Sequence, residues 1–117
     1  MLKNSILKLI MISAIIFIAI IGCEKENKKL YVGTNAEFEP FEYREGGNIV
    51  GFDIELIREI SKLINKDIEV EDMAFDGLLP ALQTKKIDLI IAGMTATEER
   101  KKFVNFSESY YKSQQAI

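Results

Sequence analysis

The residues best equipped for chemistry lie in the stretch 87–100, which combines an apolar run, a glycine, two threonines and an arginine. Its pattern predicts a buried strand, a tight loop at Gly93, and a short helix that begins with the capping-box spacing of Thr95 and Glu98. Free N–H groups and the positive end of the helix dipole would form an anion site, and Arg100 adds a planar set of donors. A carboxylate fits this arrangement. An ordinary strand, turn and helix with a solvated arginine is the alternative that the pattern leaves open.

Composition excludes several classes of site. The chain has 117 residues, 48% of them hydrophobic, which allows one small domain, and its formal net charge is −3. It has no histidine and only one cysteine, which excludes Ser–His and Cys–His pairs, imidazole-dependent zinc sites and an intramolecular disulfide. Basic residues do not cluster with aromatic ones, so we expect no nucleic acid partner. We also expect no catalytic residues, no metal and no cofactor.

The N-terminal residues 1–22 have the layout of a secretory signal. Lys3 and Lys8 give a positive start, and residues 9–21 are apolar apart from one serine. The run ends in Gly22 and Cys23, which resembles the lipobox of bacterial lipoproteins, where the cysteine is lipidated and becomes the new N-terminus. An uncleaved transmembrane anchor is the alternative. Both interpretations place the rest of the chain outside the cytoplasm at a membrane surface.

Charged residues 23–29 form a tether, and the element pattern after it predicts an α/β domain over residues 30–117. The expected strands are 30–34, 41–44 with 48–51 as a hairpin, 68–71, 87–91 and 103–106; the expected helices are 52–64 and 76–84. Asp53 and Asp76 are expected to cap the two helices. Alternating strands and helices favour a parallel or mixed sheet covered by helices.

In such sheets ligands bind beyond the carboxyl ends of the strands. Three loops would meet there: 35–41, 75–77 and 92–100. They bring Phe38, Phe75 and Arg100 to one rim, which suggests a small ligand with a carboxylate and a partly apolar side chain. Each phenylalanine taken singly is more often a core residue than a ligand contact.

Motifs spread over the whole domain resemble one family. They are 32–34, 38–43, 51–54, 77–82, 87–88, 93–95, 97–100, 106–107 and 110–111. In this order and spacing they resemble the first lobe of bacterial extracellular solute-binding proteins, family 3, which bind polar amino acids for ABC importers. The resemblance implies a single Rossmann-like lobe of the type II periplasmic-binding-protein fold, with a mixed, mostly parallel sheet. Within the family the chain looks most similar to the glutamine-binding proteins.

The resemblance assigns ligand contacts to Asn35, Phe38, Phe75, Gly93, Met94, Thr95 and Arg100. Arg100 would bind the α-carboxylate with two parallel hydrogen bonds, joined by the Thr95 backbone N–H. The Thr95 hydroxyl and the Gly93 carbonyl would meet the α-ammonium. Phe38 and Phe75 would enclose the aliphatic part of the ligand side chain.

Asn35 departs from the pattern of the glutamine-binding proteins, which often carry an aspartate at this position. An amide both donates and accepts hydrogen bonds, so glutamate, asparagine and other polar amino acids stay open as ligands. The missing negative charge argues against lysine or arginine.

Family members are considerably longer, so the resemblance implies an incomplete first lobe without the second lobe's acidic partner for the ligand ammonium. We therefore expect half of a binding site in a lipid-anchored, extracytoplasmic protein that works with ABC permease subunits. A non-functional fragment, a split gene whose separate chain supplies the second lobe, and a sensing lobe of a membrane receptor are alternatives. Some proteins with this fold are enzymes, but the chain lacks a histidine and a second lobe to supply an acid or base.

Overall fold

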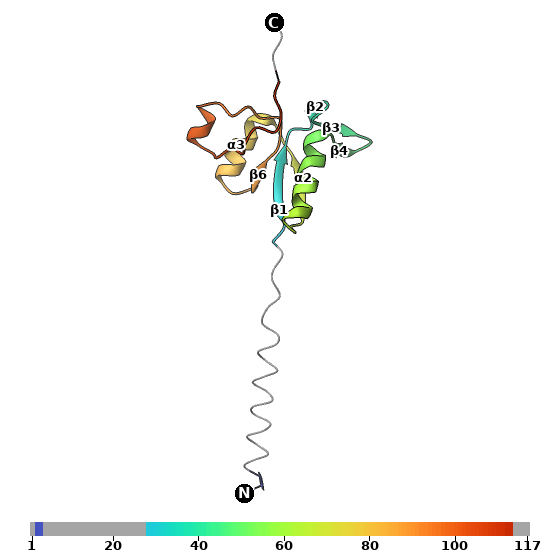
Figure 1. Ribbon diagram of the computed structural model, residues 1–117, viewed down its shortest axis with the longest axis vertical. Coiled ribbons are helices and arrows are strands. Elements are labelled where there is room, and N and C mark those ends of the chain that lie inside the picture. Colours follow the sequence, from blue (N-terminus) through green and yellow to red (C-terminus); the bar gives the residue numbers. More distant parts are fainter. Residues whose placement is uncertain (1, 4–27, 114–117) are drawn as a thin grey trace.

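The computed structural model describes residues 2, 3 and 28–113, and its elements follow one another as in Figure 1. In chain order they are β1 Leu30–Thr34, β2 Glu37–Phe38, β3 Glu42–Glu45, β4 Asn48–Val50, α2 Phe52–Leu63, β5 Ile68–Asp72, α3 Phe75–Gln83, β6 Leu89–Ile90 and the 3₁₀ turn η1 Arg100–Lys102. The expected signal segment, with Cys23, lies outside the described residues. Within them, no helix is both long and apolar enough to cross a bilayer.

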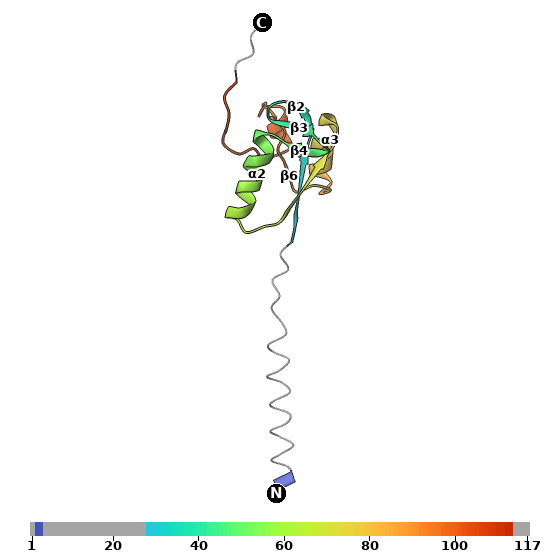
Figure 2. The same cartoon turned by 90° about the vertical axis from the view of Figure 1, so that its right-hand side faces the viewer.

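A three-stranded parallel sheet in the order β5-β1-β6 forms the centre of the fold. In the central strand β1, Val32, Gly33 and Thr34 are buried, as expected for a strand covered on both faces. Helices α2 and α3 lie on opposite sides of this sheet (Figures 1 and 2). The α/β lobe expected from the sequence is therefore confirmed.

Each helix closes its own half of the core. On one side, Leu78 and Ala81 of α3 pack with Ile87 and Ala92. The second cluster joins Ile57 of α2 to a valine of β1 and an isoleucine after β6. The helix expected over 52–64 is confirmed as α2, but only part of its apolar spacing meets the sheet. Ile54 and Ile57 are buried, whereas Leu63 and Ile64 are 85% and 50% exposed.

A second, antiparallel sheet in the order β2-β3-β4 lies beside the first. The expected hairpin is confirmed in β3 and β4, with Gly46 and Gly47 at φ +55° and +86° in its turn. The expected loop over 35–40 is wrong at Glu37–Phe38, which pairs with β3. The strands thus form two separate sheets, and the parallel one is not extended by the hairpin.

Helix α2 begins without the side-chain cap expected from Asp53. Gly51 occupies the cap position, and no side chain caps the helix. Instead, the Phe52 and Asp53 backbone N–H groups donate to the carbonyls of Pro40 and Phe41, at 3.1 and 2.9 Å. Backbone carbonyls satisfy the free donors here, which leaves the Asp53 side chain available for another role.

Two further expectations near helix ends are wrong. Helix α3 begins at Phe75 after Ala74, again without a side-chain cap, so Asp76 is not its cap. The expected helix at the end of 87–100 is only the three-residue turn η1, and Thr97 rather than Thr95 accepts the Arg100 N–H, at 3.2 Å.

Residues 103–106 are irregular rather than a strand. The sequence alternates apolar and polar residues there, but Phe103 is 61% exposed. A strand requires a neighbouring strand to accept its hydrogen bonds, and no strand in the described part of the chain pairs with this segment.

Gly51 offers a test of how α2 is placed. We expect Gly51→Ala to lower the free energy of unfolding by about 2 kcal/mol or more, because φ is +124° and an added Cβ would overlap the Phe41 carbonyl. Gly77→Ala is the matched control: a Cβ there meets no atom within 4 Å, and alanine favours a helix by up to about 1 kcal/mol. Urea unfolding of the full chain in detergent micelles, followed by circular dichroism, measures both. Equal stability of the two variants would contradict this account of the turn.

Candidate functional site

The loop after β6 is held by an unusual backbone turn at Gly93. This glycine has φ +53°, and its N–H donates to Asp53 Oδ2 at 2.8 Å. A Cβ on Gly93 would lie 3.1 Å from the Phe38 ring, so the missing side chain lets this ring approach the loop. The structure thus brings two predicted site residues, Gly93 and Phe38, into contact.

Arg100 contacts the other end of the same loop, at Thr95. Its guanidinium donates to the Thr95 carbonyl at 3.0 Å and lies 5.3 Å from the centre of the Phe75 ring. Cation–π contact and this one hydrogen bond orient the group while most of its five donors take no partner among the described residues. The remaining donors can take a carboxylate in the two-pronged geometry that arginine favours.

An open cavity of about 350 Å³ lies beside Phe75. Its lining is Asn35, Glu37, Asp72, Met73, Ala74, Phe75 and Asp76. The Asn35 side-chain amide donates to the Met73 carbonyl at 3.2 Å, which joins the ends of β1 and β5. Three carboxylates line this space, so its potential favours a positive group.

The carboxylate of Asp72 is the most firmly held of the three. It accepts from the Ala36 N–H at 2.9 Å and from the Arg44 guanidinium at 2.7 Å. That ion pair offsets its charge in part, whereas Glu37 and Asp76 form no ion pair in the described part of the chain. The net charge around the cavity stays negative.

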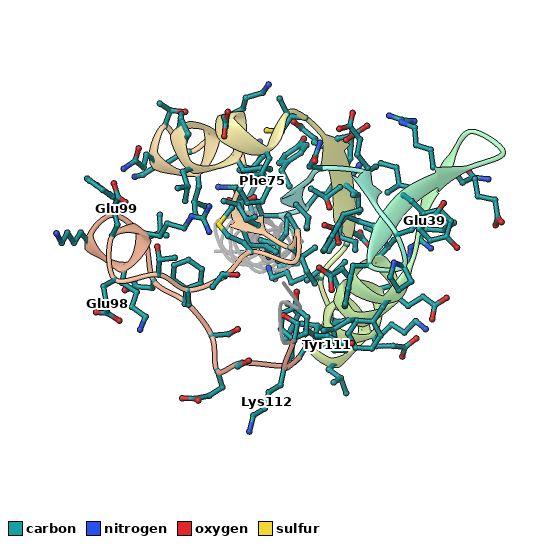
Figure 3. The ribbon with its side chains drawn as sticks, turned by 90° about the horizontal axis from the view of Figure 1, so that it is seen from above. Glu39, Phe75, Glu98, Glu99, Tyr111 and Lys112 are labelled. Atoms are coloured by element: carbon teal, nitrogen blue, oxygen red, sulfur yellow. The ribbon has the colours of Figure 1, made fainter. Side chains whose placement is uncertain are left out.

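The predicted residues fall into two neighbouring groups. Phe75 belongs to the cavity and also contacts Arg100, and Figure 3 shows it facing inward at the carboxyl end of the parallel strands while Glu98 and Glu99 extend outward from the rim. Phe38 belongs to the other group, beside Gly93. This residue is 51% exposed, and its ring stacks on that of Phe41 with the two ring centres 5.4 Å apart. Met94 packs against the α3 core cluster.

Three residues that the sequence did not single out for this site lie next to the loop 93–95 or to one another. Asp53 is fully buried, and its Oδ2 accepts the Gly93 N–H and also the Tyr110 hydroxyl at 2.9 Å. Glu42, on the buried side of β3, is 1% exposed. The sequence placed Asp53 at the start of a helix, but an aspartate there is typical of a helix cap, so its contact with Gly93 could not be predicted from this position.

Two of these residues, Glu42 and Tyr110, have raised pKa values. Burial first, and then the Asp53 side chain beside it, raise the pKa of the Glu42 carboxyl to about 8. Burial and the same aspartate raise the pKa of Tyr110 well above its usual value. Both groups are therefore neutral at pH 7.

Comparisons with known proteins agree with this geometry. A model of the bacterial extracellular solute-binding proteins, family 3, matches residues 30–117. The chain is 46% identical over 116 residues to the arginine-binding extracellular protein ArtP of Bacillus subtilis. This alignment covers 93% of the chain and 46% of ArtP. It therefore spans a little less than half the length of that relative.

Solved structures give the same picture. The arginine-bound form of domain 1 of TmArgBP, from T. maritima, is 55% identical with a TM-score of 0.71, over 74% of this chain and 70% of that one. An ancestral arginine-binding protein bound to glutamine is 52% identical with a TM-score of 0.70, over 71% and 37%.

The names of these relatives differ from one expectation. The sequence suggested a likeness to glutamine-binding proteins, whereas the names of these relatives point to arginine. The family itself is as expected, because its model matches most of the chain. The chain belongs to the bacterial extracellular solute-binding proteins, family 3.

Proposed function

We propose that this chain supplies the first lobe's share of the amino-acid site in the solute-binding component of an ABC importer. The observation that carries the proposal is Arg100, held by the Thr95 carbonyl and the Phe75 ring with most of its donors free of described partners. The ligand's α-carboxylate would bind to Arg100 and to the backbone of the loop 93–95. The family is one of transport components, and we propose no enzymatic activity.

We propose a cationic amino acid, with arginine first, as the ligand. The α-carboxylate at Arg100 would lie near the acidic cavity, because Phe75 contacts Arg100 and also lines the cavity. A positively charged ligand side chain would then meet the carboxylates of Glu37, Asp72 and Asp76. These charges outweigh the argument from Asn35 against arginine, because they surround that residue. The relatives' names support the same choice.

Glutamine stays the second candidate ligand. The Asn35 amide can both donate and accept, which suits a carboxamide. An ancestral arginine-binding protein has been solved with glutamine bound, so sites similar in sequence hold either side chain.

A single lobe can hold a ligand in this family. Domain 1 of TmArgBP has been solved in its arginine-bound form, and the structural match with this chain covers 70% of that domain's chain. We therefore propose that the chain binds by itself, weakly compared with a two-lobed site because an open rim leaves each polar contact in water. A second lobe, in the same protein or a separate chain, and ABC permease subunits are the proposed partners.

Arg100→Ala tests the carboxylate site. In isothermal titration of the full chain in detergent micelles, we expect arginine to bind and the variant to lose at least about tenfold in affinity, about 1.4 kcal/mol or more. Arg58→Ala removes an exposed arginine from α2 and is the matched control, with affinity unchanged. A folded chain that binds neither arginine nor glutamine would contradict the proposed function.

Neutralising the acidic cavity tests the choice of ligand. We expect the combined Glu37→Gln and Asp76→Asn variant to lose affinity for arginine by about tenfold while affinity for glutamine stays within about twofold, because only the cation loses a Coulomb partner. Glu39→Gln is the control, since Glu39 is exposed and outside the cavity lining. Equal losses for both amino acids would assign the cavity no part in selecting charge.

We also propose that Cys23, which lies outside the described residues, carries a lipid that anchors the chain to the outer face of the membrane. Cys23→Ser should abolish incorporation of an alkynyl fatty acid in the bacterial host and move the protein from the membrane fraction. Ser13→Ala, within the apolar run, is the control and should leave labelling unchanged. Labelling that persists in the cysteine variant would exclude this anchor.

A further inference from the structure

The buried carboxyl pair of Glu42 and Asp53 is one proton short of a satisfied network. Asp53 Oδ2 already accepts two hydrogen bonds. Glu42 Oε2 and Asp53 Oδ1 are buried and have no hydrogen-bond partner among the described residues. A hydrogen bond with the Asp53 side chain is among the causes that raise the pKa of Glu42, and a proton on Glu42 shared with Asp53 would give both oxygens a partner.

Charge balance gives the same answer. Neither carboxyl takes part in an ion pair formed by the described residues. Two adjacent negative charges without a cation are costly in a buried site, and carboxyl pairs of this kind retain a shared proton. The pair is therefore best described as one carboxylate, Asp53, and one neutral acid, Glu42.

We propose that Asp53 is the positioning residue of the loop 93–95, which is named the ligand loop below. Neutral Glu42 supports Asp53 by donating a hydrogen bond to its second oxygen, Oδ1. Through Oδ2, the same carboxylate fixes the Gly93 N–H in the ligand loop and the Tyr110 hydroxyl in the segment 107–113. Loop and outgoing segment are thus held by one acceptor. The effect on ligand binding rests on the proposed function, whereas the effect on the loop does not.

The proposal makes the loop sensitive to alkaline pH. Deprotonation of Glu42 near pH 8 would place a second charge beside Asp53 and push the pair apart. Tyr110 stays neutral there because its pKa is raised. The loop 93–95 and β4 carry no ionisable side chain, Glu37 on β2 and the other ionisable residues of α2 are exposed, and the chain has no histidine.

The same proton sets the sign of the stability change. The folded state retains the Glu42 proton from its usual pKa of 4.5 up to about 8, whereas the unfolded state loses it near 4.5. Stability from this group is complete below about pH 4.5, falls as pH rises from there to about 8, and changes no further above that.

The Gly93 amide resonance in the ligand-free full chain, in micelles, reports the loop directly. Ala92–Gly93 is the only Ala–Gly pair in the sequence, so carbonyl-labelled alanine with ¹⁵N-glycine isolates this amide. We expect its resonance to shift with a midpoint near pH 8 between pH 6 and 9. Glu42→Gln should remove the step, since its amide donates at every pH, while Glu45→Gln, an exposed change on the same strand, should keep it.

Asp53 variants separate positioning from folding. Asp53→Asn keeps an acceptor for Gly93 and can donate to an ionised Glu42, so the variant should fold but lose the step near pH 8. Asp53→Ala should leave the Gly93 amide unprotected from solvent exchange, whereas Glu55→Ala on the exposed side of α2 should not. A pH-independent resonance in the unsubstituted chain, or a step that persists in Glu42→Gln or Asp53→Asn, would overturn the proposal.

Arginine titration at pH 6.5 and 9 then extends the test to binding. We expect affinity to fall about threefold or more in the unsubstituted chain and to stay constant in Glu42→Gln. A resonance step without any binding at either pH would contradict the proposed function and leave the positioning role standing. Binding that ignores pH, in a chain whose resonance does shift, would overturn the link between this pair and the ligand.

Discussion

The pairing of β1 with strands on both of its sides is the constraint on which the rest of the lobe depends. Because β5 and β6 both run parallel to β1, the carboxyl ends of all three strands reach the same edge. The segments that follow them carry Asn35, Phe75 at the start of α3, and Gly93, which are far apart in the sequence. Without this ladder the site residues would have no common location.

A second constraint acts where the two sheets meet. The start of α2 is held by carbonyls that precede β3, and the Asp53 side chain accepts from the Gly93 N–H instead of capping the helix. A buried carboxylate needs donors, and it obtains them from Gly93 and Tyr110. The requirement to satisfy one buried side chain therefore links the helix, the loop and the outgoing segment.

Phe75 adjoins groups of opposite charge. Arg100 packs against its ring, and the acidic cavity opens next to it. An amino acid with a positive side chain has the complementary pattern, a carboxylate at one end and a cation at the other. The Phe75 ring belongs to both, because it contacts Arg100 and lines the acidic cavity.

The sequence by itself determined the α/β class, helix α2 and the hairpin, because apolar periodicity and glycine positions are local properties of the chain. Alternation at 103–106 and the aspartates at helix starts were misleading, since a strand needs a partner and a cap competes with other donors and acceptors. Only the tertiary structure decided that Asp53 faces Gly93, that Glu42 lies buried beside it, and that acidic residues surround Asn35. These relations join residues distant in sequence, and the free energy of a buried charge depends on neighbours that no local pattern specifies.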